Sequence, residues 1–320
     1  MVLRHFARAV QISLYSAALL LVSGAPAADA AASKECGRTC LTKMLNAYLA
    51  AVFKHDPNAV ALSDDYYATE NTVEVHKGDG AWKSVTAYGP LERRFFDPHQ
   101  GTAAFFGILE KDGHDQITSV RIKVDGGKVS EAEWIFGTQG PGGRGDANPP
   151  GLIKYPPPTG LLPASERTSR FIMITLPNDY FQAVVEHDGD WVPNDKDCIR
   201  IENGGGTTAN SLPAAAAAAD GKPADKTGIP VPRRGGCLEN FANFKNLTKD
   251  LALRRFPIVD EEAGVVLGTA IYVRYPNVPA QDNLVHEYFY IRGGKIAGLW
   301  TSMYFLPKGS PVTSGWENRK

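Results

Sequence analysis

Residues His286–Trp300, which read HEYFYIRGGKIAGLW, are the segment from which the rest of the sequence is interpreted. Its aromatic and β-branched run leads into Gly293-Gly294, and a second apolar run follows the two glycines. Two apolar runs joined by a glycine pair, which accepts positive φ without steric cost, predict a β-hairpin. Residues 118–134 repeat this plan around a second glycine pair, with Ser119 at the position that the histidine takes downstream. The sequence therefore predicts the same hairpin twice, and only the later copy contains the histidine.

The two hairpins belong to a longer internal repeat. Residues 46–56 match residues 178–188, and residues 126–128 match residues 293–295. Matching positions lie farther apart in the second pair because the later copy contains the extra stretch 204–236, which is rich in Ala, Gly and Pro. The chain is therefore expected to hold two copies of one unit, the second with a low-complexity insert.

Each copy opens with an amphipathic helix. Its apolar residues fall at helical spacing, at Leu41, Leu45, Tyr48, Leu49, Val52 and Phe53 in the first copy and at Tyr180, Phe181, Val184 and Val185 in the second. A helix followed by long strands predicts an α+β fold of two tandem cone-shaped units, each a curved antiparallel sheet wrapped around N-terminal helices. The mouth of such a cone can hold a ligand.

Shifts in composition divide the chain into segments. We expect a signal peptide at 1–30, a first unit at 34–137, a Gly/Pro-rich linker at 138–165, a second unit at 166–310 with its insert at 204–236, and a tail at 311–320. The many glycines and prolines of the linker predict an extended, largely unpacked chain.

Residues 1–30 have the pattern of an export signal. Arg4, His5 and Arg8 form a basic start, Ala9–Val22 is mainly apolar, and small residues at 25–30 offer cleavage sites. The apolar run is short and interrupted for a membrane span, and an uncleaved anchor is the alternative. We therefore expect a secreted or periplasmic protein without membrane contact after signal cleavage.

Export changes how the four cysteines are interpreted. In an oxidising compartment an even number suggests disulfides, although the pattern alone does not give their connectivity. Cys198 and Cys237 bracket the insert, and we favour a bond between them. Closing a loop of about 40 residues contributes roughly 4 kcal/mol in the chain-entropy model. Cys36 and Cys40 are left unassigned. Zinc is the rival ligand, but no Cys-x-x-Cys pair or neighbouring histidine is present, so we expect no metal.

The composition narrows the classes of partner. The net charge is −1 with 22% charged residues, and no basic stripe of the kind that binds nucleic acid is present. The sequence also lacks a phosphate-binding glycine loop, a nucleophile elbow and a metal-spaced set of His, Asp and Glu. We expect no cofactor and no nucleic acid, and a small molecule as ligand; the oligomeric state is not predicted.

Several short motifs carry a family resemblance. The turn Gly294-Lys295-Ile296, with His286 eight residues before its glycine and Trp300 six after, resembles the SnoaL-like branch of the nuclear transport factor 2-like superfamily. A longer ordered set is similar to a tandem domain of unassigned function in secreted and biosynthetic-cluster proteins of fungi, with bacterial members. The set comprises Val192-Pro193, Cys198, Arg200-Ile201-Glu202, Gly204-Gly205, Cys237, Arg254-Arg255-Phe256, Val259-Asp260-Glu261 and His286-Glu287. The likeness spans nearly all of Cys36–Phe305 and departs at Asn203, where a glycine is usual.

The resemblance implies the fold and a Cys198–Cys237 bond, but no established reaction. Relatives such as ketosteroid isomerase, scytalone dehydratase, limonene epoxide hydrolase and polyketide cyclases place a few acid–base residues inside an apolar cone. Equally many relatives are non-catalytic, so the fold does not decide the function.

His286 is the leading candidate for proton transfer. The resemblance places it where ketosteroid isomerase carries a cavity acid and where many SnoaL-like sequences carry histidine. A histidine in such a cavity titrates near neutral pH and can shuttle a proton. Asp260 is expected to orient it. Tyr288, Tyr290 or Tyr304 is expected to stabilise a developing negative charge.

The sequence leaves open which way His286 points. If the later strand follows the apolar alternation of residues 120–124, Glu287 faces inward and His286 faces outward. A β-bulge reverses this assignment, because a slip of one residue exchanges the two faces. On a regular strand only one of the two side chains reaches the interior.

Arg255, Glu287 and Trp300 form the expected ligand-binding set. Arginine can hold a carboxylate with two hydrogen bonds, and the alternative for Arg255 is a structural ion pair with Asp260. Trp300, like Trp134, is expected in a cavity wall or in the core.

Two short motifs recur in both copies. His-Asp stands at 55–56 and at 187–188, and Glu-Asn stands at 70–71 and at 202–203. Their recurrence at helix ends and turns favours a structural role. A cavity-facing Glu70 is the alternative.

Two classes of function follow. The first is an exported, cofactor-independent lyase, isomerase or cyclase-like enzyme that acts on a small apolar or aromatic molecule in the second cone. The second is a non-catalytic small-ligand-binding or assembly module built as an intramolecular pseudo-dimer. A cavity with two convergent titratable groups favours the enzyme, and a filled or apolar interior favours the module.

Overall fold

The computed structural model describes residues 36–138, 147–207, 236–239 and 241–317. Residues Glu35–Lys320 cluster into one compact body, distinct from Met1–Lys34. The expected signal peptide at 1–30 and most of the expected insert at 204–236 lie outside the described residues. No helix in the described part of the chain combines the length and apolar character that a bilayer span requires.

The first unit is a six-stranded sheet with two helices. Its elements are α1 (Arg38–Phe53), β1 (Leu62–Glu70), β2 (Val73–Val75), α2 (Ala81–Ser84), β3 (Val85–Asp97), β4 (Thr102–Lys111), β5 (His114–Asp125) and β6 (Lys128–Phe136). The strand order is β2-β1-β6-β5-β4-β3. Strands β1 and β6 run parallel, and the other neighbours are antiparallel.

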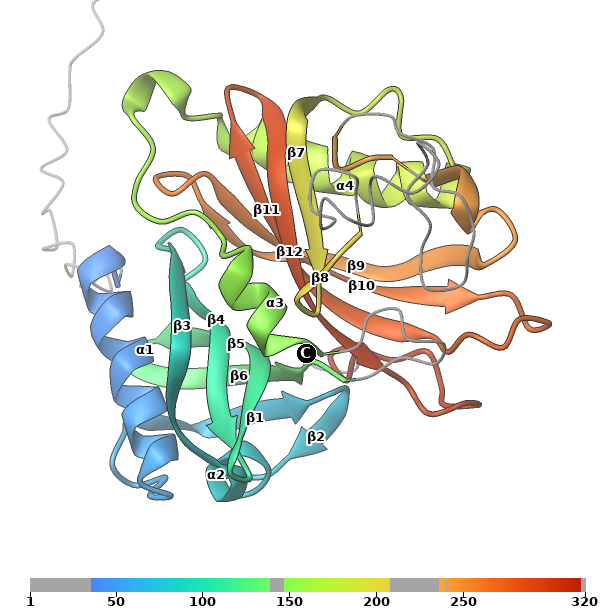
Figure 1. The fold of residues 1–320 in the computed structure, drawn as a ribbon. Coiled ribbons are helices and arrows are strands. Elements are labelled where there is room, and N and C mark those ends of the chain that lie inside the picture. Colours follow the sequence, from blue (N-terminus) through green and yellow to red (C-terminus); the bar gives the residue numbers. More distant parts are fainter. Residues whose placement is uncertain (1–35, 139–146, 208–235, 240, 318–320) are drawn as a thin grey trace, which may run out of the picture. The chain divides into compact units, whose positions relative to one another are not determined.

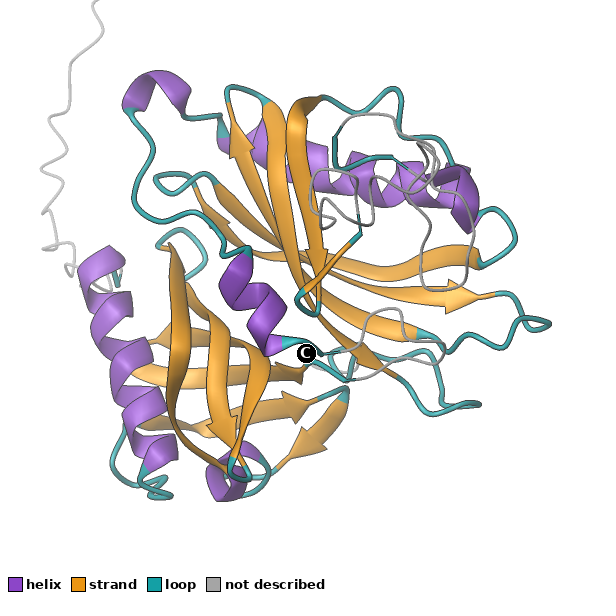
Figure 2. Ribbon diagram, in the orientation of Figure 1, coloured by secondary structure: helices purple, strands orange, loops and turns teal. Residues whose placement is uncertain are grey.

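The second unit repeats this plan. Its elements are α4 (Arg170–Glu186), β7 (Asn194–Glu202), β8 (Gly205–Gly206), η4 (Phe241–Phe244), β9 (Thr248–Asp260), β10 (Val265–Arg274), β11 (Asn283–Arg292) and β12 (Lys295–Phe305). The strand order is β8-β7-β12-β11-β10-β9, with β7 and β12 parallel. Figures 1 and 2 show two sheets of long strands and few helices. The expected α+β class, with two tandem curved-sheet units, is confirmed.

The two predicted hairpins are present. Strands β11 and β12 are joined at Gly293 and Gly294, with φ of 56° and 73°. Strands β5 and β6 are joined at Gly126 and Gly127, with φ of 54° and 76°. Glycine has no Cβ to clash in this left-handed region, so both turns use the residue that the geometry favours.

A helix fills the concave side of each sheet. Helix α1 buries Leu41, Leu45, Tyr48, Leu49, Ala51 and Val52, and helix α4 buries Met173, Leu176, Pro177, Tyr180, Phe181, Ala183 and Val184. Removing such side chains from water contributes about 1.5–3 kcal/mol for each large one. Each unit therefore has its own core between helix and sheet.

A third core joins the opposite faces of the two sheets. The ring of Tyr288 on β11 lies 4.7 Å from that of Phe106 on β4 and 5.2 Å from that of Phe95 on β3. Trp300 and Tyr290 belong to the same apolar cluster. Because both faces of each sheet are covered, residues of either orientation on a central strand are buried.

Two buried aspartates, one from each unit, make equivalent hydrogen bonds across the interface between the units. Asp97 ends β3 and accepts hydrogen bonds from the backbone N–H of Val259 at 2.9 Å and from Arg170 at 2.6 Å. Asp260 ends β9 and makes the matching bonds, to a backbone N–H of the first unit at 2.9 Å and to Arg38 at 2.8 Å. Asp97 of the first unit thus binds the start of α4 and strand β9 of the second unit. Asp260 of the second unit binds the start of α1 and strand β3 of the first unit in the same way.

The segment between the units differs from the expected unpacked linker. Residues Pro149–Lys154 form helix α3, and Ala164–Glu166 form the short helix η2. Asn148 accepts a hydrogen bond from Gly151 N at 3.1 Å, and proline stands at the start of α3. This combination of cap and proline begins a helix. Leu152 of α3 is 1% exposed and packs in the apolar core between the two sheets. The segment is therefore partly packed rather than fully extended.

Two disulfides are present, Cys198–Cys237 and Cys36–Cys40. The first is the pair that we favoured, and it ties β7 to the segment before η4. The C-terminal tail also packs on the body: Trp316 Nε1 donates to Thr69 Oγ1 at 3.0 Å, and Tyr67 donates to the Gly315 carbonyl.

Candidate functional site

Strand β11 is buried on both faces, so its alternating side chains enter two different environments. Glu287 points to the same side as Phe289, which packs against α4. His286 points to the same side as Tyr288, which packs against Phe106 of the first unit. Both His286 and Glu287 are 0% exposed. The outward face of the strand is therefore the interface between the units, and the inward side chain is Glu287.

His286 lies in a polar cluster at this interface. Its Nδ1 is 2.7 Å from Ser119 Oγ, which is 2.5 Å from the Tyr288 hydroxyl. Its Nε2 is 3.5 Å from Glu133 Oε1. Ser119 is the first-copy counterpart of His286, so two equivalent positions of the repeat meet across the interface.

Glu133 is the charged centre of this interface cluster. Its carboxylate accepts from Arg255 Nη2 at 2.6 Å and from Arg121 Nε at 3.1 Å. Burial acts to raise the pKa of Glu133, but Arg255, His286 and Arg121 outweigh it and hold the pKa well below its ordinary value. Burial lowers the pKa of His286, although Glu133 opposes this. The cluster therefore holds an ionised carboxylate beside a neutral imidazole.

The other residues expected to act with His286 lie apart from it. Asp260 binds Arg38 and the backbone of the first unit. Tyr304 is partly exposed and packs at a small apolar cluster formed by Ile135, Ile271, Leu284 and Leu306. The structure brings His286 and Tyr288 together through Ser119, and it does not gather Asp260 or Tyr304 with them.

Arg255 and Trp300, two of the expected ligand-binding residues, also lie at the interface. Arg255 pairs with Glu133 rather than with Asp260. Trp300 is 3% exposed, and its indole N–H donates to the Tyr155 carbonyl at 2.8 Å. Of the expected set, only Glu287 faces the interior of the second unit.

A row of polar side chains crosses that interior. Glu202 on β7 is the Cα partner of Thr301 on β12, which is the Cα partner of Glu287 on β11. Directly paired residues face the same side of a sheet. Tyr272 donates to Glu287 Oε1 at 3.4 Å. Glu287 Oε2 and Thr301 Oγ1 are buried and have no partner of hydrogen-bond geometry in the described part of the chain, although the Thr301 hydroxyl lies close enough to Glu287 to act to lower its pKa.

Glu287 is held in its neutral form at pH 7. Burial, followed by the negative charge of Glu202, raises the pKa of Glu287 to about 8, although Arg200 acts in the opposite direction. Burial and the charge of Glu287 also raise the pKa of Tyr272 well above its ordinary value. A carboxylic acid with this pKa keeps its proton at neutral pH and can donate a hydrogen bond.

The first unit has apolar side chains at the two equivalent places. Its row runs from Glu70 to Trp134 to Val120, through the same strand pairings. Trp134 is 1% exposed, and its indole N–H donates to the Tyr48 hydroxyl at 3.1 Å. The second unit thus replaces a tryptophan and a valine with a threonine and a neutral carboxyl.

Sequence reasoning missed Thr301, Tyr272 and Arg200 as members of this interior. The signal was present, because the register that aligns the two glycine turns sets Trp134 opposite Thr301. Matching Trp134 with Trp300 by residue type conceals that exchange.

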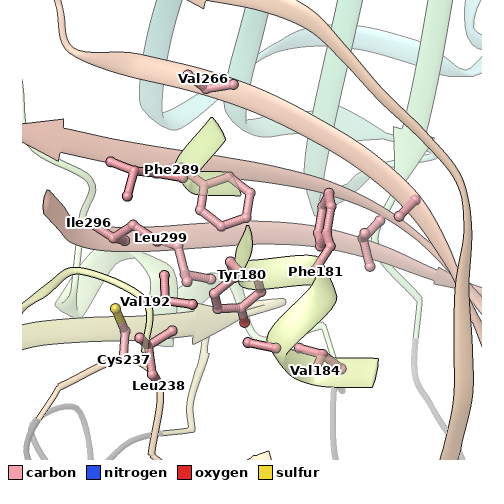
Figure 3. Close-up of a cluster of buried hydrophobic side chains, with 14 of the residues drawn as sticks. Tyr180, Phe181, Val184, Val192, Cys237, Leu238, Val266, Phe289, Ile296 and Leu299 are labelled. Carbon is pink, nitrogen blue, oxygen red and sulfur yellow. The ribbon is translucent and has the colours of Figure 1, made fainter. Parts of the chain in front are cut away.

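Large side chains occupy much of the remaining interior. In Figure 3, Tyr180 and Phe181 of α4 lie close to Phe289 and Leu299 of the sheet. The rings of Tyr180 and Phe289 are 5.0 Å apart. Two surface clefts of about 240 Å³ each also occur, and neither is lined by Glu287. Neither cleft therefore reaches the polar row around Glu287.

The recurring motifs have structural surroundings. His55 and His187 adopt positive φ just after their helices, and their Nδ1 atoms lie 2.6 Å and 2.9 Å from backbone carbonyls. Asn71 and Asn203 also adopt positive φ. Asparagine tolerates this left-handed conformation better than most residues other than glycine. Burial raises the pKa of Glu70.

A family model described as a domain of unknown function, DUF8021, matches residues 166–302. The matched range begins just before α4 and ends within β12, so it covers the second unit and the row from Glu202 to Thr301 and Glu287. Neither a curated protein nor a solved structure matches the chain. The second unit is therefore similar to a recognised domain whose description assigns it no reaction.

Proposed function

We propose that this protein is an exported module that binds a small neutral molecule inside the second unit, with the first unit as its structural partner. The observation that carries the proposal is a pair of neighbouring buried polar groups, Glu287 and Thr301, whose Oε2 and Oγ1 atoms have no partner of hydrogen-bond geometry among the described residues. Leaving a buried polar atom unpaired costs about 1–3 kcal/mol. A ligand that bonds to both atoms removes this penalty and gains affinity from it.

The chemistry of the two groups restricts the ligand. Protonated Glu287 donates an O–H, and the hydroxyl of Thr301 donates or accepts. The negative charge of Glu202, which raises the pKa of Glu287, also disfavours an anionic ligand. The neighbouring rings of Tyr180 and Phe289 favour an apolar body. A small ketone, alcohol or phenol meets these requirements.

In this proposal the first unit stabilises the second unit and has no ligand site of its own. Its interior is filled by Trp134, and it contributes Ser119 and Glu133 to the interface cluster around His286. The reciprocal pairs at Asp97 and Asp260 have the character of a dimer interface within one chain. These contacts support the pseudo-dimer as the frame of the ligand site.

Export and family identity belong to the same proposal. Two disulfides and the basic, apolar start of the chain support a secreted or periplasmic location. The helix on a curved six-stranded sheet, present twice, supports assignment of both units to the SnoaL-like branch of the nuclear transport factor 2-like superfamily.

Methyl NMR tests the binding proposal. The protein, with labelled Ile, Leu and Val methyls, is titrated with cyclohexanone, cyclohexanol and phenol. We expect shifts at Val266, Leu299 and Ile296, which line the interior of the second unit, and none at Leu45 or Leu49 in the first.

Two variants make the test specific. Glu287→Val introduces the first-unit residue and should abolish the interior shifts. Glu70→Gln, at the first-unit counterpart of Glu202, should leave them unchanged. Shifts confined to surface methyls, or equal binding by Glu287→Val, would contradict the proposal.

Catalysis is the second candidate, and the raised pKa of Glu287 favours it. A carboxyl that keeps its proton at pH 7 can serve as a general acid in a cofactor-independent lyase, isomerase or cyclase-like reaction. The hydroxyl of Tyr272 lies 3.4 Å from the carboxyl group of Glu287. In this reaction Glu287 would transfer the proton, and His286 would only contact Ser119 and Glu133 at the interface between the units.

Deuterium exchange tests this candidate. Cyclohexanone in D₂O is followed by proton NMR for loss of the signal at the carbon beside the carbonyl. Exchange that exceeds the buffer rate and disappears in Glu287→Gln supports catalysis. Exchange at the buffer rate, with the ketone bound, leaves the protein as a binding module.

A further inference from the structure

A cleft of about 240 Å³ opens where the two units and the segment between them meet. It is lined by Arg93, Arg94 and Phe95 of β3, by Arg38 at the start of α1, and by Leu161 and Tyr290. The site is separate from the interior of the second unit, because neither Glu287 nor Thr301 reaches it.

Three arginines but only one carboxylate, that of Glu92, are among the residues that line the cleft. Arg38 pairs with Asp260 at 2.8 Å, and Arg94 pairs with Glu92 at 2.7 Å. Arg93 donates only to neutral backbone carbonyls, those of Pro157, Pro158 and Glu92. Arg93 therefore has no carboxylate partner among the residues that the structure describes.

The backbone contacts of Arg93 fix its position and leave a donor available. Its Nε and Nη1 make all of the hydrogen bonds described for it, so Nη2 has no partner in the described part of the chain. A guanidinium that is held in place loses little side-chain entropy when it binds a carboxylate. This arrangement resembles a preorganised anchor more than a mobile surface arginine.

Glu92, which is paired with Arg94, and Thr159 also line the cleft, and the remaining wall is mainly apolar. Phe95 and Tyr290 pack edge to face with their ring centres 6.0 Å apart, and Leu161 lies 52% exposed at the rim. An aromatic wall beside a fixed cation suits a ligand with one charged end and one flat apolar end.

We propose that this cleft binds a small aromatic carboxylate, with its carboxylate on Arg93 and its ring against Phe95 and Tyr290. The volume is below the roughly 300–1,000 Å³ of sites for drug-sized ligands, so the cleft accepts a molecule of about one ring. Since both units and Leu161 line the cleft, the ligand also stabilises the folded protein by mass action.

Calorimetric titration with benzoate tests the proposal, with benzamide as the neutral analogue of the same shape. We expect benzoate to bind, benzamide to bind at least tenfold more weakly, and added salt to weaken benzoate. Arg93→Gln should weaken benzoate at least tenfold. Arg167→Gln is the matched control, because Arg167 also donates to a carbonyl of the same segment, at 3.0 Å, but lies outside the cleft.

A second variant guards against misfolding of Arg93→Gln. Leu161→Glu places a negative charge at the exposed rim and should abolish benzoate binding with an unchanged melting temperature. Glu287→Val should bind benzoate normally, so failure of the interior site and failure of this cleft are distinguishable. Equal binding of benzoate and benzamide, or benzoate binding that survives both Arg93→Gln and Leu161→Glu, would overturn the proposal.

Discussion

Replacing Glu133 by Gln removes the only negative charge that Arg255 contacts among the described residues. The carboxylate side chain is 1% exposed, and the side chains of Arg121 and Arg255 are 4% and 28% exposed. Breaking a buried ion pair by removing one partner typically costs about 3–5 kcal/mol, because the other charge stays buried. Glu131 still pairs with Arg121 at 2.7 Å, and Arg255 reaches solvent. We therefore expect a loss near the lower end, about 3 kcal/mol.

Urea unfolding at pH 7, followed by tryptophan fluorescence, measures this loss. Glu131→Gln is the matched control: it removes a carboxylate from the same arginine, but its side chain is 16% exposed. Partly exposed pairs contribute at most about 1 kcal/mol. A loss for Glu133→Gln no larger than that for Glu131→Gln would refute the view that this cluster holds the units together.

The same variant changes the pH dependence. The fold lowers the pKa of Glu133, so below its ordinary pKa the unfolded state binds a proton that the folded state does not. Stability from this group is therefore present above the ordinary pKa and is lost as pH falls through the folded pKa. Glu133→Gln should flatten this acid limb between pH 5 and the acid transition. An acid limb of unchanged slope would contradict the assignment.

Three further outcomes are expected. Folding raises the pKa of Glu287 from 4.5 to about 8, so the free energy of unfolding should fall as pH rises between these values. Glu287→Gln should lessen this fall, measured as the urea midpoint at each pH. A variant whose midpoints change with pH as those of the unmodified protein do would contradict the raised pKa. Replacing Cys198 and Cys237 together by Ser opens a loop with a sequence separation of 39 and should cost about 4 kcal/mol in urea unfolding; a loss below about 1 kcal/mol would argue against this bond. Asp97→Asn and Asp260→Asn should each lower the melting temperature by a similar amount, whereas a large effect from only one would contradict the reciprocal arrangement.

Local signals explain what the sequence predicted well. A glycine pair between apolar runs fixes a hairpin within a few residues, and helical spacing identifies α1 and α4 from their own side chains. The internal repeat then extends one unit to two. These features need no knowledge of distant contacts.

The orientation of His286 could not be read in the same way. Alternation separates two faces of a strand, and it correctly sets Glu287 apart from His286. It does not say what covers each face. Since the first unit covers the face that a lone sheet would expose, His286 is buried against Ser119 rather than in solvent or in a cavity.

The charged partners were hidden for a related reason. Glu133 and Arg255 are far apart in sequence and meet only when the two sheets pack. Asp97 and Arg170 meet in the same way. Recurrence of an aspartate at the end of both β3 and β9 was a usable signal, but its partner depends on the packing of the units.

The carboxyl carbon of Glu287, labelled with ¹³C and titrated from pH 3 to pH 10, tests most directly whether the second unit holds a neutral hydrogen-bonding acid in its interior. We expect a midpoint near pH 8 and a change in that midpoint when cyclohexanone is added. A midpoint near the ordinary value of 4.5, unaffected by the ketone, would contradict it.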